Sequence, residues 1–291
     1  MRVLVAGWFS FERMGASAGD LLARDLVCGW LTDAGHEVDV ALAPPFTGGV
    51  DWRKARPERY SHVLFVCGPF GNGEPLTPFL ERFRGLPLLG LNLTMLEGLD
   101  TWDPFDLLLE RDSSRATNPD LVFLTRPPLV PVVGVVLIDA QPEYGAGDLH
   151  AQADEAIERL LRLRDVTAVR IDTRLDVNAT GLTSPAQIES AIARMDAVIT
   201  TRLHGMVLAL KNGVPALVVD TVAGGGKVSR QAETIGWPML LRADSLDDDL
   251  LAETLDRCLA PAGRELAASC AARAARGLDG VRERLLAALG S

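Results

Sequence analysis

Residues 195–230, MDAVITTRLHGMVLALKNGVPALVVDTVAGGGKVSR, hold two buried-strand patterns on either side of one helix pattern. Residues 197–200 are a short, largely β-branched apolar run, and residues 216–220 repeat that pattern. Threonines at the end of the first run are helix-capping residue types, and Gly213 is typical of a helix end. The segment therefore predicts a strand–helix–strand unit.

The turn between the first strand and the helix carries Arg202 and His204. A helix N-terminus presents free N–H groups and positive dipole charge, so this turn favours an anion. It also favours neutral imidazole at His204, which can then exchange protons near pH 7. After the second strand comes the glycine run 224–226, followed by Lys227. We expect these two cations and one histidine at one edge of a parallel sheet.

Composition narrows the class of protein. The chain has 291 residues, 48% of them hydrophobic, and a net charge of −10, which argues against general binding to nucleic acid. No apolar run approaches the roughly 20 residues of a membrane span, and the N-terminus is predicted to enter a strand directly, with no signal peptide. Four cysteines without a CxxC spacing predict a reduced, cytoplasmic chain with no structural zinc.

The first half of the chain alternates strand and helix patterns. Strands are expected at residues 2–9, 37–42, 62–67, 87–91, 105–109 and 121–124, with helices at 20–34 and 75–83. Three prolines then fall within residues 127–131, which is typical of a hinge between domains. The first domain is predicted to cover residues 1–128.

The second half, residues 129–291, restarts the alternation. Strands are expected at residues 132–138, 166–171, 197–200, 216–220 and 238–241, and helices within 147–164, from Ser184, before Gly213, and at 246–259 and 262–289. Two such sets predict two doubly wound α/β domains with their ligand in the cleft between them. The last helix is expected either to cover the first domain or to form a homodimer.

Further candidate site residues follow predicted strands in the first half of the chain. Gly19 and Asp20 come after the first strand, Gly68 opens a glycine-containing loop after the third, and Arg111 with Asp112 follows residues 105–109. Because the carboxyl ends of parallel strands share one sheet edge, we expect these residues to face a ligand. His36, His62, His150 and Cys67 show patterns that favour structural or solvated positions.

Each candidate also has a structural interpretation. Arg202 can be held by a nearby carboxylate, and Arg111 by Asp112 or Glu110. Lys227 can be a solvated lysine, Asp20 can complement the helix dipole, and His204 can pack at the helix start.

The sequence lacks several common motifs. It contains no GxxxxGK[ST], no GxGxxG after the first strand and no GxSxG. It also lacks HExxH and paired acidic metal-binding motifs. We therefore expect no resident cofactor and no metal site.

Residues 196–205, DAVITTRLHG, resemble the polysaccharide pyruvyl transferase family, in which a strand ends in Arg-Leu-His. The Gly-Val-Pro at residues 213–215 and the Gly-Lys at 226–227 follow in the family's order. Gly-Asp at residues 19–20 and Glu-Arg-Asp-Ser at 110–113 are weaker matches to further motifs of that family.

The resemblance implies a GT-B-like fold of two Rossmann-like domains facing across a cleft. It also implies transfer of a pyruvyl group from phosphoenolpyruvate to a sugar or glycan, forming a ketal on two hydroxyls. His204, Arg202 and Arg111 would be catalytic, with the histidine as acid or base and the arginines stabilising the departing phosphate. The residues implied to bind substrate are Lys227, Gly205, Leu203, Asp20, Gly19, Gly68 and Asp112.

Two other classes of function stay open. A GT-B glycosyltransferase or sugar-nucleotide epimerase would use the same cations to hold a diphosphate. A non-catalytic two-domain protein would keep the fold and bind the ligand without turnover.

Overall fold

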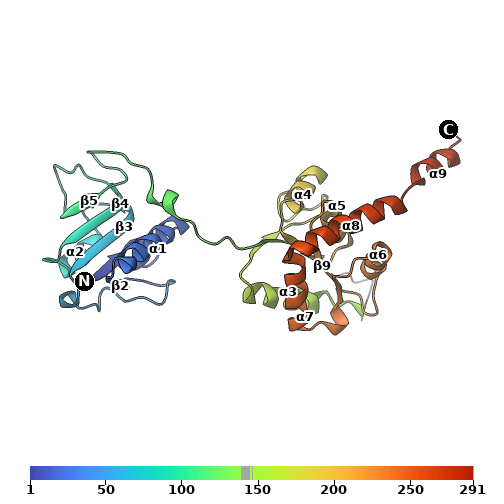
Figure 1. Cartoon of the computed structure of the whole chain (residues 1–291), viewed down its shortest axis with the longest axis horizontal. Coiled ribbons are helices and arrows are strands. Elements are labelled where there is room, and N and C mark those ends of the chain that lie inside the picture. The colour runs from blue at the N-terminus through green and yellow to red at the C-terminus, as the bar shows by residue number, and fades with distance from the viewer. Residues whose placement is uncertain (139–144, 146, 291) are drawn as a thin grey trace. The chain divides into compact units, whose positions relative to one another are not determined.

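The computed structural model describes residues 1–138, 145 and 147–290. The chain divides into two compact units, Met1–Pro128 and Leu129–Ser291 (Figure 1). Each unit contains one five-stranded sheet in which every strand pair is parallel.

The sheet of the first unit has the strand order β2-β1-β3-β4-β5. Its strands are β1 (Arg2–Ala6), β2 (Glu37–Val40), β3 (His62–Phe70), β4 (Leu88–Met95) and β5 (Leu107–Leu109). Its helices are α1 (Ala18–Asp33) and α2 (Leu76–Arg82), with 3-10 turns η1 (Trp8–Ser10), η2 (Pro57–Arg59) and η3 (Leu121–Leu124).

Both faces of this sheet bury apolar side chains, as the sequence pattern of β1 requires. Val3 and Val5 point into the cluster that includes α1, whereas Leu4 and Ala6 point into the cluster that includes α2. The α2 side is rich in aromatic rings, with Phe65 and Phe79 centroids 5.9 Å apart. A parallel sheet covered in this way is the layered arrangement of α/β proteins.

The second unit repeats the same winding, with the strand order β10-β9-β8-β6-β7. Its strands are β6 (Val132–Val136), β7 (Thr167–Arg170), β8 (Ala197–Thr200), β9 (Ala216–Asp220) and β10 (Leu240–Arg242). The helices are α3 (His150–Leu163), α4 (Pro185–Ile192), α5 (Leu203–Lys211), α6 (Lys227–Ile235), α7 (Asp248–Leu259), α8 (Pro261–Gly277) and α9 (Val281–Ala288), and η5 spans Ala243–Ser245.

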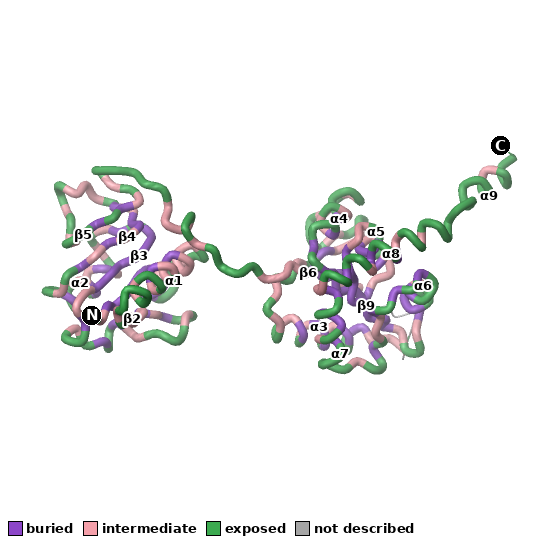
Figure 2. The backbone as a smooth tube through the Cα atoms, in the orientation of Figure 1, coloured by how far each residue is buried: buried purple, intermediate pink, exposed green. Residues whose placement is uncertain are grey.

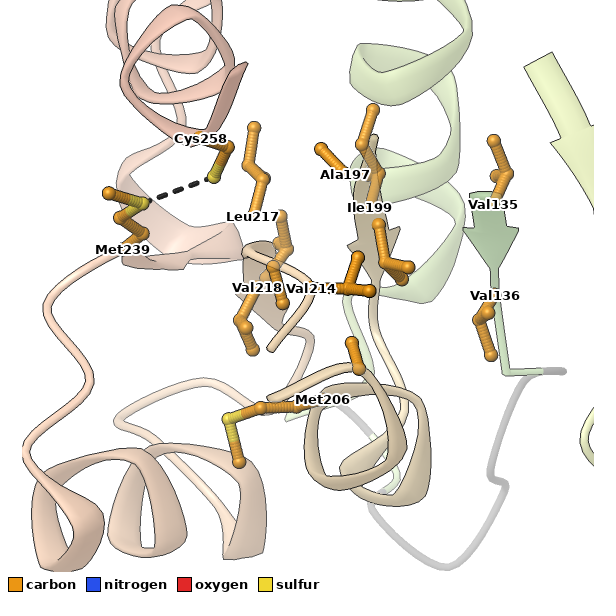
Figure 3. Packing of buried hydrophobic residues seen from close by; sticks show 14 of the residues in the cluster. Val135, Val136, Ala197, Ile199, Met206, Val214, Leu217, Val218, Met239 and Cys258 are labelled. Atoms are coloured by element: carbon orange, nitrogen blue, oxygen red, sulfur yellow. Dashed lines mark hydrogen bonds between the residues drawn. The ribbon is translucent and has the colours of Figure 1, made fainter. Parts of the chain in front are cut away.

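The predicted strand–helix–strand unit is β8, α5 and β9. Side chains of β8 and β9 pack against α5, where Met206 is completely buried (Figure 3). On the other side, Cys258 of α7 lies with its Sγ 3.1 Å from the Sδ of Met239. Every residue of β8 and β9 is buried, which explains their continuous apolar pattern.

Both units are Rossmann-like, and their topology confirms the prediction of two doubly wound α/β domains. In each sheet the first strand has the second strand on one side and the third on the other. The chain therefore changes direction between β1 and β3, and again between β6 and β8. Ligands of open α/β sheets bind outside the carboxyl ends of the strands at this switch point.

Residues 121–124 are wrongly predicted as a strand, because they form the 3-10 turn η3. Asp120 caps this turn by accepting the Val122 N–H at 2.9 Å, and the Leu121 N–H donates to the side chain of Asn92 at 3.0 Å. Phe123 is 76% exposed, so its apolar character does not reflect a core position.

The predicted helix at residues 262–289 is also wrong, because it is two helices, α8 and α9. The break falls at Gly280, whose φ of 78° lies in the left-handed region that favours glycine. No residue of α9 is buried: all are exposed except Leu286, which is half-buried, and Figure 2 shows the segment mostly green.

Several element boundaries differ from expectation, and three of them bear on the candidate residues. The first strand ends at Ala6, because η1 follows it. Helix α1 starts at Ala18, with Ser17 as N-cap, so Asp20 lies within the first turn. Strand β3 continues to Phe70 and includes Gly68, which the sequence pattern placed in a loop.

None of the helices formed by the described residues combines the length and apolarity that a bilayer crossing demands. Cys28, Cys67, Cys258 and Cys270 are all free thiols.

Candidate functional site

The turn after β8 lies at the switch point of the second unit. Thr200 shapes it, because its Oγ1 accepts the Arg202 N–H at 3.0 Å and donates to the carbonyl of Val136 at 2.8 Å. Thr201 accepts the Ile138 N–H on its side chain at 2.9 Å. Neither threonine is the N-cap of α5. That position belongs to Arg202, whose side chain makes no capping bond.

Arg202 extends its guanidinium toward the segment after β7. Its Nη1 donates to Asp172 Oδ1 at 3.2 Å and to Thr173 Oγ1 at 3.0 Å. The Arg202 side chain is 15% exposed and that of Asp172 18%. The salt bridge considered as a structural interpretation for Arg202 is therefore present. Among the described residues, its Nε and Nη2 have no partner and can still donate to a ligand.

His204 is the second residue of α5, and it is exposed. Across residues 1–138, 145 and 147–290, its ring has no hydrogen-bond partner. The N–H groups of Leu203, His204 and Gly205 lie in the first turn of α5, where an α-helix supplies no internal acceptor. With Arg202 beside them, they form a positive helix end that can receive an anion.

Gly205 and Leu203 are packing residues in this turn. A Cβ at Gly205 would lie 2.2 Å from Thr200 Oγ1 and 2.9 Å from Val136 Cγ1, so only glycine allows α5 this close to the sheet. Leu203 is half-buried against the core of the second unit. Both residues thus set where His204 stands.

Lys227 is the first residue of α6, rather than a loop residue, and it is exposed. The N-terminus of α6 already has an internal anion. Asp220 Oδ2 accepts the N–H groups of Gly226 at 2.7 Å and Ser229 at 2.8 Å, and the Ser229 hydroxyl at 2.5 Å. A ligand at this loop therefore meets the Lys227 ammonium, which has no partner within the described part of the chain.

His150 occupies a buried position that its sequence did not distinguish. Its Nδ1 contacts Asp148, and its Nε2 lies 2.8 Å from Thr221 Oγ1. The Leu149 N–H donates to the carbonyl of Thr221 at 2.9 Å. These contacts tie the start of α3 to the glycine loop that leads to Lys227, which is a structural role.

Arg111 follows β5 in the first unit, and its partners differ from those expected. Its Nη1 donates to Asp120 Oδ2 and its Nη2 to Thr94 Oγ1, both at 2.8 Å. The two neighbours proposed as its partners are engaged elsewhere. Glu110 pairs with Arg115 at 2.7 Å, and Asp112 accepts from the Thr117 hydroxyl at 2.9 Å.

Asp20 acts as a helix-capping acid in the structure. Its Oδ2 accepts both the Ser17 N–H and the Ser17 hydroxyl at 2.7 Å, in a reciprocal capping box. Gly19 lies in the same turn, and a Cβ there would lie 3.5 Å from the Ser17 hydroxyl. Asp20 and Gly19 therefore help to begin α1. These contacts are with Ser17, and Arg111 takes no part in them.

Gly68 allows close packing beside Trp8. Its φ is +85°, and a Cβ would lie 2.1 Å from Trp8 Cδ1. Cys67, just before it, has a φ of 66°, and Asn92 on β4 has a φ of 58°. The Asn92 amide donates to Cys67 Sγ at 3.3 Å and to Asp120 at 3.2 Å. Left-handed conformations of non-glycine residues often occur at functional sites, yet no sequence signal marks these two.

Cys67 is not an activated nucleophile. Burial is the largest influence on the Cys67 thiol, and it raises the pKa to about 11 against the lowering effect of the Asn92 hydrogen bond. The Asp20 and Asp120 carboxylates add smaller raising effects, and Arg111 a smaller lowering one. A cysteine nucleophile reacts as the thiolate, which this environment disfavours.

The turn that carries Arg202 and His204 lies within a segment that matches a known family. Residues 136–221 match polysaccharide pyruvyl transferase. This match confirms the predicted resemblance over β8, α5 and β9. Lys227 and the weaker motifs at residues 19–20 and 110–113 lie outside the matched residues.

Several solved structures resemble the chain weakly. Spinosyn rhamnosyltransferase SpnG shares 17% identity, with 94% of this chain and 95% of that chain covered and a TM-score of 0.35. Spinosyn forosaminyltransferase SpnP shares 15% identity, with 99% of each chain covered and a TM-score of 0.34. UDP-GlcNAc 2-epimerase from Methanocaldococcus jannaschii shares 8% identity, with 89% of this chain and 93% of that chain covered and a TM-score of 0.32. At such TM-scores these likenesses carry no functional weight.

A comparison with curated proteins gave no match. The fold class therefore rests on the topology of the two sheets, and the resemblance to polysaccharide pyruvyl transferase on residues 136–221.

Proposed function

We propose that the protein transfers a pyruvyl group from phosphoenolpyruvate to two hydroxyls of a sugar or glycan. The observation that carries the proposal is the turn after β8. It combines a fixed arginine with unused donors, an exposed histidine and an open helix N-terminus, within the segment that matches polysaccharide pyruvyl transferase.

Phosphoenolpyruvate suits this turn because it carries a phosphate and a carboxylate. The first-turn N–H groups of α5 are suited to one of these anions, and the guanidinium of Arg202 offers directed donors. Lys227 adds an exposed positive charge on the neighbouring helix α6. Anionic groups on the donor would thus be met by charge-assisted hydrogen bonds.

The chemistry requires proton transfers that His204 can perform. One acceptor hydroxyl loses its proton and attacks C2 of the enol, while C3 gains a proton. The second hydroxyl then attacks C2 and displaces phosphate, which leaves with that hydroxyl's proton as inorganic phosphate, and the ketal closes. An exposed imidazole at the donor site can take a proton or give one. Arg202 would stabilise charge on the departing phosphate.

The first unit is proposed to recognise the acceptor. Asp112 and Asp20 offer carboxylate oxygens, which accept hydrogen bonds from sugar hydroxyls. Arg111 stays a predicted catalytic residue, held by Asp120 and Thr94. The proposed reaction uses phosphoenolpyruvate as co-substrate and needs no resident cofactor.

The proposal is tested by acceptor-dependent release of inorganic phosphate from phosphoenolpyruvate. The full chain is incubated with phosphoenolpyruvate and a set of glycans that carry free hydroxyl pairs. Mass spectrometry then checks whether a responding glycan has gained one pyruvylidene group. Phosphate release together with that product supports the proposal.

A thermal-shift comparison provides the control. A ligand that binds only the folded protein raises its melting temperature. Phosphoenolpyruvate should raise it, whereas nucleotide sugars should not. Stabilisation by a nucleotide sugar alone would contradict the proposal and favour a glycosyltransferase or epimerase.

A further inference from the structure

Asp172 reaches Arg202 across thirty residues of sequence. It lies two residues after Arg170, the last residue of β7, and its Oδ1 accepts a hydrogen bond from Arg202 Nη1 at 3.2 Å. Thr173 adds a second acceptor for the same nitrogen at 3.0 Å. The guanidinium is therefore held from one side, by one charged and one neutral oxygen.

The segment that carries Asp172 is itself fixed by internal hydrogen bonds. The Asp172 carboxylate accepts the N–H groups of Arg174 at 2.9 Å and Ala179 at 3.0 Å. Asn178 donates to the carbonyls of Asp172 at 2.9 Å and Arg174 at 2.6 Å. A carboxylate with these bonds cannot leave Arg202 without losing its place in the loop.

The electrostatic state of Asp172 agrees with this geometry. Burial alone would raise the pKa of its carboxyl group. The two backbone N–H groups, the Arg202 guanidinium and Arg174 outweigh that effect and lower the pKa below its ordinary value. Asp172 is thus a permanent negative charge near neutral pH, and it keeps Arg202 ordered whether or not a ligand is bound.

Ordering an arginine in advance matters because a free arginine loses much rotamer freedom when it grips a ligand. A side chain that is already fixed avoids this loss, and it presents its remaining donors in one direction. We propose that Asp172, assisted by Thr173, is a positioning residue that holds Arg202 for the anionic group of the donor. This inference rests on the proposed function.

The opposite role for Asp172 predicts a different result. If the carboxylate occupied the place of the ligand's anion, removing its charge would strengthen ligand binding. The fixed loop and the unused Nε and Nη2 of Arg202 favour positioning over competition.

Asp172→Asn and Thr173→Val test the inference in the full-length protein. Asp176→Asn is the matched control, because Asp176 lies in the same loop and pairs with Arg174 at 2.6 Å without contacting Arg202. Thr173→Val keeps the shape of the side chain and all bonds to Asp172, so it remains informative if Asp172→Asn folds poorly.

The first readout needs no ligand. The Nε–Hε NMR signal of Arg202, assigned with Arg202→Lys, should report a mobile side chain in Asp172→Asn and a rigid one in the control. Unchanged Arg202 dynamics in both Asp172→Asn and Thr173→Val would overturn the inference.

The second readout is calorimetric binding of phosphoenolpyruvate. Loss of a charge-assisted bond should weaken affinity about tenfold in Asp172→Asn and about threefold in Thr173→Val. The control should bind like the wild type. Tighter binding by Asp172→Asn would overturn the inference. Absence of binding by the wild-type protein would instead contradict the proposed function, and the NMR result would then decide alone whether Asp172 fixes Arg202.

Discussion

Arg202 and Arg111 are fixed in the same way, although they lie in different units. Each follows a parallel strand, and each donates to one aspartate and one threonine. An arginine held by a neighbouring carboxylate keeps its charge, because the guanidinium group is not deprotonated in proteins. The ion pair seen at each arginine is therefore compatible with ligand binding, since the planar guanidinium has donors to spare.

His204→Ala should abolish pyruvyl transfer and leave the fold intact. The imidazole is exposed and makes no hydrogen bond to the described residues, so its removal takes nothing from the core. Phosphate release measures activity, and thermal unfolding measures stability. His36→Ala is the control, because that histidine lies in the turn before β2. Full activity in a folded His204→Ala protein would eliminate His204 as acid or base.

Gly205→Ala should destabilise the second unit by about 1–3 kcal/mol, because the new methyl group overlaps Thr200 Oγ1 and overpacks the turn. Gly29→Ala is the matched control, since a methyl group added to that helical glycine would meet no neighbouring side chain within 4 Å. It should be neutral or slightly stabilising. Chemical denaturation measures both, and equal effects would contradict the close approach of α5 to β8.

Among the secondary-structure elements, sequence patterns predicted the Arg-Leu-His turn because it follows the continuous apolar run of β8 and precedes a helix pattern that ends at Gly213. They failed at η3, where Leu-Val-Phe-Leu resembles a strand but is held by Asp120 and Asn92. They also missed Asp172, because a contact across thirty residues depends on strand order and leaves no local pattern. Gly280 did carry a signal for the break between α8 and α9.

Helix α6 gives a prediction about stability and pH. Burial alone would raise the pKa of Asp220, but the Ser229 hydroxyl and the N–H groups of Gly226, Ser229 and Val222 lower it below its ordinary value of 3.8. A lowered pKa in the folded state stabilises the protein above that value, and this contribution is lost as the pH falls below it.

Asp220→Asn should therefore lower the free energy of unfolding by about 2–4 kcal/mol at pH 7, because an amide nitrogen would face buried N–H donors. The difference in the free energy of unfolding between this variant and the wild type should shrink as the pH falls below 4. Chemical denaturation of both proteins between pH 7 and pH values below 4 tests this. Asp248→Asn, which removes an exposed partner of Arg159, should change stability little. A difference independent of pH would contradict the proposed charge state of Asp220.

At the scale of the whole molecule, residues 125–131 connect two units that each have their own sheet and core. Leu129 in this segment is 92% exposed. Thermolysin, which cuts before large apolar residues, should cleave here first and leave two fragments that keep their secondary structure by circular dichroism. Early cleavage within β3, β4, β8 or β9 would contradict this division.

The central claim is that phosphoenolpyruvate binds at the turn carrying Arg202 and His204. Its most direct test is calorimetric titration of phosphoenolpyruvate into the full-length protein and into Arg202→Ala. We expect saturable one-site binding by the wild type and an affinity at least about tenfold weaker in Arg202→Ala. Equal binding by both proteins, or none by the wild type, would contradict it.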